Sequence, residues 1–397
     1  MSTTCCGGPC YADGLEVVVE AVIGKLGHVA GAFATRNISF EMDLVPLHFS
    51  RLPLRKVLNW FLTETSVVFK PSGAWGLPTI LQVEPTSRCN LKCRVCPVAT
   101  GLERPQGDMH PALFRRIVDE IGSTLLVIIF WDWGEPFLHP NAYEMIRYAR
   151  QAGIKVVAST NGHVFASGDH AREVVESGLD VLVFSVDGTD QSTYQHFREK
   201  GRLDAVLEGI RRVVSEKKRL ASSTPVVNLR FIVMKHSEHQ VPLARDFARS
   251  LGVDVLTLRK FHFVPGTGGG INSETPLGSS LVPSEIRYQL PALPQADQRP
   301  VRVSRNPCRN LWNCPTVHWD GTVCSCFMDY NERRPLGSLQ GLSFREIWYG
   351  APYRALRERF RRDWRGLSPC GECASGFLGG DVGREANAEA FFFAERR

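Results

Sequence analysis

Six short apolar runs in the middle of the chain restrict the folds that it can adopt. The segments between these runs have helical spacing, as in the stripe that begins with Leu113, Phe114 and Ile117 and the stripe that begins with Leu203 and Val206. Strands that alternate with helices are joined by crossovers, which arranges the strands in parallel. We therefore predict an α/β fold whose sheet is open or curled into a partial barrel. The six predicted strands are 79–85, 125–131, 154–159, 181–186, 226–234 and 254–259.

Three cysteines follow the first predicted strand directly. Cys89, Cys93 and Cys96 have the spacing Cys-x3-Cys-x2-Cys, which places three thiols on one short loop. Cysteine thiolates hold iron–sulfur clusters, and a fourth thiolate would complete the ligands of a 4Fe-4S cluster. Three local ligands leave one iron open to another molecule. We expect Lys92 and Arg94, which lie between the thiols, to favour the thiolate form.

The composition favours metal binding by these thiols over disulfide pairing. The chain has 12 cysteines in 397 residues, with neither a secretory signal nor an apolar run of membrane-spanning length. We therefore expect a cytoplasmic protein, in which clustered cysteines hold metal more often than they form disulfides. The net charge of +6 is small for this length, so we expect no nucleic-acid partner.

Polar residues follow the next three predicted strands, at the edge of a parallel sheet where ligands bind. Taken one by one, these residues are typical of turns. Together with the cysteine loop and in this order, residues 79–260 resemble the radical S-adenosylmethionine (SAM) superfamily. That resemblance implies a partial (β/α)6 barrel, a 4Fe-4S cluster on Cys89, Cys93 and Cys96, and SAM bound at its open iron. The residues that it implies for SAM binding are Gly134, Glu135, Pro136, Ser159, Asn161, Ser185, Asp187 and Arg198.

A second group of cysteines lies near the carboxyl end of the sequence. Cys308-x12-Gly321-x4-Cys326, followed by Cys370-x2-Cys373, resembles the SPASM/twitch extension of the same superfamily, which holds auxiliary clusters. The resemblance implies one auxiliary 4Fe-4S cluster on these four cysteines. Cys314 and Cys324 are alternative ligands, although the spacing from the glycine favours Cys326. A zinc site on Cys93, Cys96, Cys370 and Cys373, or a zinc ribbon at 307–378, is the competing interpretation.

The other segments are predicted from composition alone. The first ten residues contain Cys5, Cys6 and Cys10, and this segment either binds metal or is a mobile tail. The amphipathic segment 50–70 either packs on the barrel as a helix or contacts a membrane surface. The run of arginines between Arg354 and Arg365 predicts either a solvated helix face or a docking site for an acidic electron donor, which would be a flavodoxin or ferredoxin. The predicted domain plan is an N-terminal extension at 1–77, a core at 78–265, a linker at 266–306, an auxiliary domain at 307–378 and a poorly fixed tail at 379–397.

The resemblance implies an enzyme that reductively cleaves SAM and abstracts hydrogen from a small-molecule substrate. Relatives with a single twitch-type cluster oxidise an alcohol carbon, so dehydrogenation of an alcohol or sugar-like metabolite is expected. Such a reaction needs a base. The candidates near strand ends are Asp132, Lys235, His236 and His262. Two alternatives stay open, namely a ribosomal-peptide maturase that crosslinks or epimerises its substrate, and a non-catalytic iron–sulfur or zinc protein.

Overall fold

Six parallel strands form the centre of a ten-stranded sheet in the computed structural model, which describes residues 31–262, 276–290, 306, 308–373 and 387–393. The strand order is β11-β10-β9-β3-β4-β5-β6-β7-β8-β12, and the pairs from β3 to β8 are all parallel. The six central strands are β3 (Ile80–Val83), β4 (Val127–Ile129), β5 (Lys155–Thr160), β6 (Val181–Ser185), β7 (Val226–Val233) and β8 (Val255–Lys260). The predicted parallel α/β architecture is thus confirmed, with each strand within a few residues of its predicted position.

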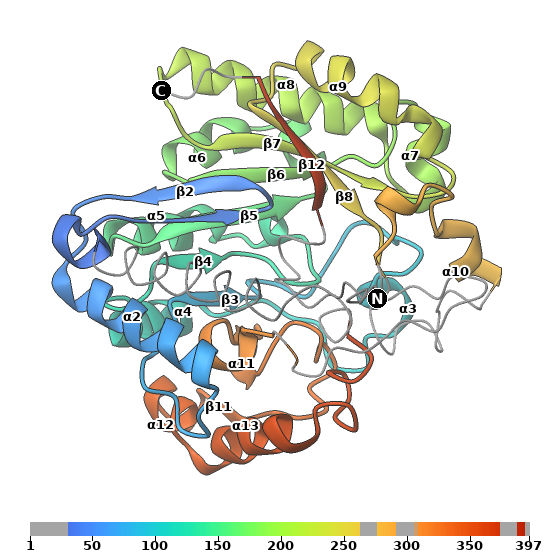
Figure 1. Ribbon diagram of the computed structural model, residues 1–397. Coiled ribbons are helices and arrows are strands. Elements are labelled where there is room, and N and C mark those ends of the chain that lie inside the picture. Colours follow the sequence, from blue (N-terminus) through green and yellow to red (C-terminus); the bar gives the residue numbers. More distant parts are fainter. Residues whose placement is uncertain (1–30, 263–275, 291–305, 307, 374–386, 394–397) are drawn as a thin grey trace, which may run out of the picture.

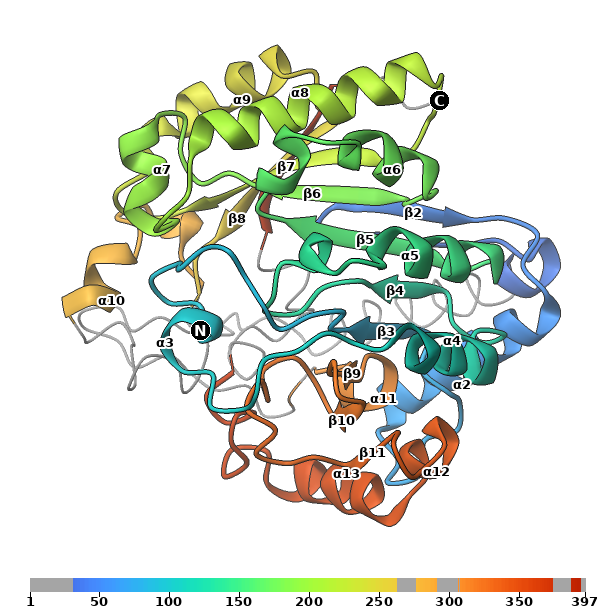
Figure 2. The same ribbon diagram turned by 180° about the vertical axis from the view of Figure 1, so that it is seen from behind.

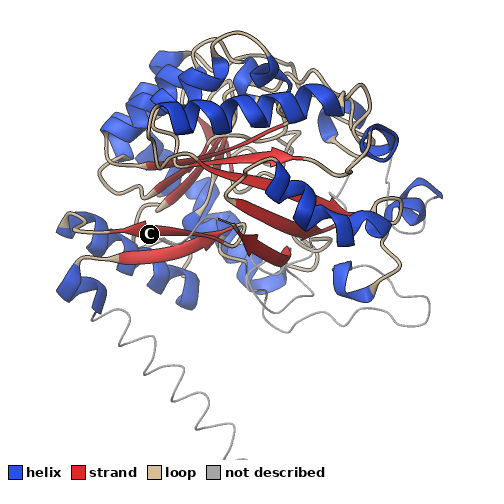
Figure 3. Cartoon of the chain, turned by 90° about the horizontal axis from the view of Figure 1, so that it is seen from above, coloured by secondary structure: helices blue, strands red, loops and turns tan. Residues whose placement is uncertain are grey.

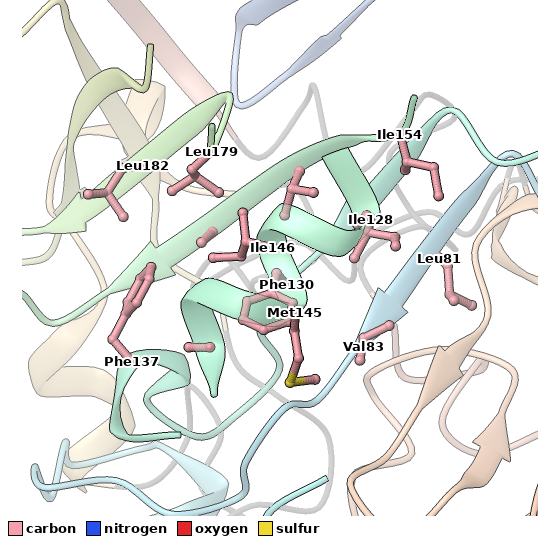
Figure 4. Packing of buried hydrophobic residues seen from close by; sticks show 14 of the residues in the cluster. Leu81, Val83, Ile128, Phe130, Phe137, Met145, Ile146, Ile154, Leu179 and Leu182 are labelled. Carbon is pink, nitrogen blue, oxygen red and sulfur yellow. The ribbon is translucent and has the colours of Figure 1, made fainter. Parts of the chain in front are cut away.

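Helices cover the outer face of this sheet, as Figures 2 and 3 show. They are α4 (Pro111–Ile121), α5 (Ala142–Gln151), α6 (His170–Glu176), α7 (Gln191–Phe197), α8 (Leu203–Arg219) and α9 (Val241–Ser250), whereas α3 (Pro97–Thr100) is a single turn that follows Cys96 in the cysteine loop. Side chains alternate between the two faces along each strand, and the outward ones, such as Ile128 and Leu182, pack against these helices. Figure 4 shows Ile146 of α5 beside Ile128 in this layer. The stripe predicted from Leu113 onward is buried along α4, as expected.

An N-terminal hairpin covers part of the inner face of the sheet. Strands β1 (Ile38–Met42) and β2 (Val45–Phe49) pair antiparallel around a turn at Asp43 and Leu44, both of which have positive φ. Figure 1 shows this blue hairpin on the side of the sheet opposite to α5 and α6. Hairpin side chains join the inward strand residues in one buried cluster, for example Val45 and Leu47 with Val127. These two strands were not predicted, because five-residue segments without Gly or Asn at the turn carry a weak pattern.

Helix α2 (Leu54–Phe69) follows the hairpin and occupies the amphipathic segment predicted at 50–70. Its Val57 and Trp60 belong to the same buried cluster as the hairpin, so packing on the barrel is the observed arrangement. The Lys56 ammonium donates to the Gly153 carbonyl at 2.8 Å, which attaches the helix to the end of α5. None of the helices within the described ranges has the length and apolar character needed to span a bilayer.

The C-terminal region extends the same sheet on both edges. Strand β9 (Thr316–Val317) pairs parallel with β3, and β10 (Thr322–Cys324) and β11 (Gly337–Ser338) follow antiparallel. The described segments after β8 contain the α-helices α10 (Pro276–Leu281), α11 (Asn310–Asn313), α12 (Phe344–Trp348) and α13 (Ala351–Asp363). The predicted hairpin around Gly321 is present, and a reciprocal cap between Ser343 and Glu346 begins α12.

Three predictions about the C-terminal half need correction. The tail is not poorly fixed throughout, because β12 (Asn387–Phe392) pairs antiparallel with β8 and completes the sheet. The predicted linker contains α10, whose Leu281 is buried against the loop of Cys93. The basic run on α13 is not entirely solvated, since Arg357 is buried and donates from Nε to the Leu311 carbonyl at 2.9 Å. That carbonyl and the neighbouring aromatic rings replace the water that the guanidinium loses.

Candidate active site

A cavity of about 1010 Å³ lies between the inner face of the sheet, the N-terminal hairpin and the C-terminal region. It is bounded by the cysteine loop after β3, by the carboxyl ends of the central strands, and by the turn of the β1–β2 hairpin. Cavities of several hundred cubic ångströms or more are of the size that holds small molecules and cofactors. The groups that line it are therefore the first candidates for chemistry.

The first three cysteines all line this cavity. Backbone bonds from Lys92 N to Glu199 O (3.1 Å) and from Arg94 N to Phe197 O (3.3 Å) fix their loop against the end of α7. Burial and, second, the Glu135 carboxylate raise the pKa of the Cys89 thiol to about 11. Burial, followed by repulsion from Cys93, raises the pKa of Cys96 to about 12. Ionising all three thiols together is therefore unfavourable unless a cationic metal centre compensates, and this donor set fits an iron–sulfur cluster.

The expectation that Lys92 and Arg94 promote ionisation is wrong. Lys92 is exposed, and Arg94 Nε pairs instead with Glu199 Oε1 at 3.1 Å. The cation that the structure brings to the thiols is Arg198, whose Nη1 lies 3.7 Å from Cys93 Sγ. Sequence proximity failed here because side chains on a loop can point away from their neighbours' sulfur atoms.

Glu135 is held with its carboxylate beside the cysteine loop. Its Oε2 accepts from Asn161 N at 2.7 Å and its Oε1 accepts from Thr160 Oγ1 at 2.8 Å. Burial raises the pKa of this carboxyl to about 7 despite these bonds. The preceding Gly134 passes so close to the loop that a Cβ atom would lie 2.0 Å from the Thr86 carbonyl oxygen. Only glycine fits there, and it lets Glu135 enter the cavity.

The other predicted SAM contacts separate into two groups. Ser159, Asn161, Ser185 and Arg198 line the cavity. Asp187 is fully buried behind it, accepting from Arg198 Nε at 2.6 Å and from Ile232 N at 2.9 Å. Asp187 therefore fixes the position of Arg198, while Pro136 begins the short turn of helix η1 (Pro136–Leu138) after Glu135.

The cysteines of the second group converge on the other side of the same cavity. Cys308, Cys326, Cys370 and Cys373 all line it. Burial and, second, repulsion from Cys373 raise the pKa of the Cys308 thiol to about 11. The pKa of the Cys326 thiol is also raised, first by burial and then by repulsion from the other three cysteines. The position of all four thiols in one cavity fits the four ligands expected for an auxiliary cluster.

Two further cysteines differ in position. Cys314 also lines the cavity, whereas Cys324 is buried against the His318 imidazole. The Cys5, Cys6 and Cys10 head lies outside the described residues. Within the described ranges, no three His, Cys, Asp or Glu side chains gather tightly enough to hold a single metal ion.

Two of the four base candidates line the cavity, Asp132 and His262. Lys235 is exposed and His236 lies beside the His196 ring with centroids 4.4 Å apart, and neither lines the cavity. Asp132 Oδ1 accepts from Gln82 Nε2 at 3.0 Å. Burial raises the pKa of Asp132 to about 6.

Asp132 also begins a chain of charged groups that crosses into the C-terminal region. Its Oδ2 lies 3.4 Å from His318 Nε2, and His318 Nδ1 lies 2.8 Å from Glu332 Oε1. Burial lowers the pKa of His318, but Asp132, Cys324 and Glu332 outweigh that effect and raise it well above its ordinary value. His318 is therefore a cation between two carboxylates, and it joins the predicted core to the predicted auxiliary domain.

The sequence analysis missed a group of three charged residues that meet in the cavity. Asp43, at the hairpin turn, contacts Arg230 and lies 2.7 Å (Oδ1) from Arg259 Nη1. Both arginines occur on the inner face of apolar strands, β7 and β8, and a charged residue in such a run was a usable signal. No local pattern pointed to Asp43, because its partners are distant in sequence.

Comparison with known proteins agrees with this geometry. The family model of the Radical SAM superfamily matches residues 83–235, and that of the SPASM iron–sulfur cluster-binding domain matches residues 308–374. The chain is 26% identical over 305 residues to a tungsten-containing aldehyde ferredoxin oxidoreductase cofactor-modifying protein of Pyrococcus furiosus, covering 70% of this chain and 82% of that relative.

Two further similarities are informative at different levels. An AdoMet-dependent heme synthase of Methanosarcina barkeri is 30% identical over 202 residues, which cover 50% of this chain and 54%, about half, of that relative. The structure of Streptococcus suis SuiB bound to the precursor peptide SuiA aligns with a TM-score of 0.58 and 15% identity, covering 83% of this chain and 76% of that one. At this identity the second similarity concerns the fold alone.

Proposed function

Because this chain belongs to the radical SAM superfamily and carries a SPASM iron–sulfur domain, we propose that it cleaves SAM reductively and abstracts a hydrogen atom from a small molecule. The observation that carries this proposal is a single cavity lined by both cysteine groups and by the inner face of the sheet. The names of two relatives, a cofactor-modifying protein and a heme synthase, support a biosynthetic small-molecule substrate.

The cysteines that would hold the two clusters are Cys89, Cys93 and Cys96 for the first and Cys308, Cys326, Cys370 and Cys373 for the second. A reduced cluster held by Cys89, Cys93 and Cys96 would supply the electron for the reductive cleavage of SAM, and with it the radical chemistry that removes hydrogen from the substrate. Glu135 offers a buried carboxylate for the SAM ammonium, and Arg198 offers a guanidinium for the SAM carboxylate. Ser159, Asn161 and Ser185 supply further polar contacts at the strand ends.

Asp132 is the base that the geometry favours for a dehydrogenation. It lines the cavity and has His318 and Glu332 behind it, so a proton taken from substrate stays next to compensating charge. His262 lines the cavity too, but burial lowers its pKa to about 4, which makes it a weak proton acceptor near neutral pH. The hairpin and α2 make apolar contacts with the inner face of the central strands, and these contacts exclude water from that part of the barrel.

Anaerobic reconstitution followed by iron, sulfide and SAM-cleavage measurements tests the proposal. About eight irons per chain are expected, four for each cluster. Replacing Cys89, Cys93 and Cys96 together by Ala should abolish 5′-deoxyadenosine formation and leave about four irons. Bound zinc without SAM cleavage would instead identify a non-catalytic metal protein.

A matched pair of variants tests the assignment of the second cluster. Cys326→Ala should lose iron, because Cys326 lies in the enclosure shared by the four thiols. Cys324→Ala should keep its iron, because Cys324 faces His318 outside the cavity. Equal iron loss in both variants would contradict the assignment.

A reductant must also reach the clusters, and we propose an acidic flavodoxin or ferredoxin as the donor. The exposed face of α13 carries Arg354, Arg359, Arg361 and Arg362, although Glu358 pairs with the last two. Reduction that depends on this face should slow as salt is raised, since exposed charges are screened. A rate independent of ionic strength would exclude this docking site.

A further inference from the structure

Two arginines in the barrel share one carboxylate, and this charge imbalance identifies the kind of substrate. Arg230 and Arg259 both point to the inner face of the sheet, and both contact Asp43 from the hairpin turn. Guanidinium groups stay protonated at any accessible pH, so the three side chains together carry a net charge of +1, and within the described ranges neither arginine pairs with a second carboxylate.

The charge is buried as well as uncompensated. Arg230 is only 8% exposed, and its Nε has no hydrogen-bond partner among the described residues. A buried donor without a partner is costly, and so is a buried charge without a counterion. The other two arginines that line the cavity do not share this imbalance, since Arg198 pairs with Asp187 and Arg309 pairs with Glu64.

The two arginines lie where a substrate would have to bind. Arg230 is the cross-strand neighbour of Ser185, which lines the cavity at the proposed SAM site, and Arg259 is the neighbour of Ile232 on the next strand. The Arg230 guanidinium also reaches across the barrel to within 6.0 Å of the Trp131 ring centre, beside Asp132. An anion held there would be bordered by an aromatic surface and by the proposed base.

We propose that Arg230 and Arg259 bind an anionic group of the substrate, a carboxylate or a phosphate, with Asp43 holding the two guanidinium groups in place. This inference rests on the proposed function, because it assigns the substrate class for the same cavity. Paired N–H donors of arginine match both kinds of oxyanion. The incoming anion supplies the missing counter-charge and a partner for the Arg230 Nε donor.

Calorimetric titration of the reconstituted holoenzyme with SAM tests the site, with inorganic phosphate and succinate as separate probes at constant ionic strength. Saturable binding of phosphate, succinate or both is expected, and the stronger probe identifies the group. Arg259→Gln should weaken that binding at least tenfold. Asp43→Asn should tighten it several-fold, since it removes the competing carboxylate. Arg219→Gln removes an exposed arginine of α8 and serves as the matched charge control, with unchanged binding.

The thermal unfolding of each variant shows whether it is folded before its binding is interpreted. Arg259→Gln leaves a neutral Arg230–Asp43 pair and should fold, so it decides the question alone if Asp43→Asn does not. If Asp43→Asn folds, it should have a lower Tm that phosphate or succinate raises more than in the wild type. Equal binding in the wild type and Arg259→Gln, or no saturable binding to the wild type, would overturn the anion site. Wild-type SAM cleavage without substrate is measured separately, so failure of the proposed function is distinguished from failure of the anion site.

Discussion

Asp132 is almost fully buried, yet it lines the cavity, and it shows how one residue connects the two cysteine groups. Its carboxylate is supported by Gln82 from β3 and by His318 from the turn between β9 and β10. Burial and the neighbouring Glu84 carboxylate act to raise the pKa of Asp132, while His318 acts to lower it. The result, about 6, lies in the range where a carboxylate can accept a proton at neutral pH.

The first prediction concerns the pH dependence of turnover. A base must be ionised to accept a proton, so the rate of substrate oxidation should rise with pH through about 6. Asp132→Asn should lower the rate by roughly 10²-fold or more and remove this rise. Product formation in single-turnover assays measures both effects between about pH 5 and pH 8, where the stability of folded proteins tends to be greatest. Lys235→Ala should retain the rise, and its loss there would reassign the base.

At this scale the sequence was informative only where chemistry depends on local spacing. The three cysteines lie together in the cavity because one short loop fixes their spacing, and the bond from Glu135 N to Arg88 O brings Gly134-Glu135 beside that loop. The contact of Asp43 with Arg230 and Arg259 joins three separate strands or turns, which no local pattern specifies. His318 was missed for the same reason.

Among the elements, α2 presents two unlike faces. One face is buried in the barrel cluster through Val57 and Trp60. The opposite face exposes large apolar side chains, with Leu58 48% exposed and Phe69 64% exposed. Contact of this outer face with a membrane surface stays a prediction. Co-sedimentation with anionic vesicles at low salt tests it, and wild-type protein that stays in the supernatant would exclude it.

The second prediction uses two adjacent residues of this helix. Val57 has no exposed surface, so Val57→Ala should reduce the free energy of unfolding by about 2 kcal/mol through lost burial and a cavity. Leu58→Ala should change it by less than about 0.5 kcal/mol, because Leu58 is half exposed. Denaturant titration followed by circular dichroism measures both. Equal losses would mean that the outer face is also covered.

The elements that were predicted well are those whose own residues carry a full periodic pattern or turn signal, without reference to another part of the chain. The stripe of α4 is buried position by position, and the turn at Gly321 has the expected hairpin. The β1–β2 hairpin and β12 depend on a partner surface formed elsewhere, the inner face of the sheet and the edge of β8. Their own residues alternate too briefly to be distinguished from loops.

Across the whole molecule, the sheet does not divide into two parts. Gln82 N donates to the Pro315 carbonyl at 3.0 Å, so the ladder continues from the predicted core into the predicted auxiliary domain. Asn313 adds a second connection, since its Oδ1 accepts from Thr79 N at 3.0 Å and from Thr79 Oγ1 at 2.6 Å. All of these groups are buried at the junction.

The third prediction is that both regions unfold in one transition. Denaturant curves recorded by far-ultraviolet circular dichroism and by cluster absorbance should coincide. Asn313→Ala leaves the Thr79 donors without their acceptor and should lower stability by about 1–3 kcal/mol, shifting both curves together. Asn141→Ala is the matched control, since that side chain makes no capping bond to α5. Two separate transitions would contradict this prediction.

The antiparallel strand β12 has a consequence for how the molecule is made. Strand β8 ends at Lys260, but its outer neighbour begins only at Asn387. During translation, a nascent chain released as far as the auxiliary cysteines still has an open edge on β8, where unpaired backbone groups favour association with other chains. Strand β12, which covers this edge, is synthesised after all the cysteines of the two groups. The edge of β8 therefore stays open to aggregation until after the last of these cysteines has been synthesised.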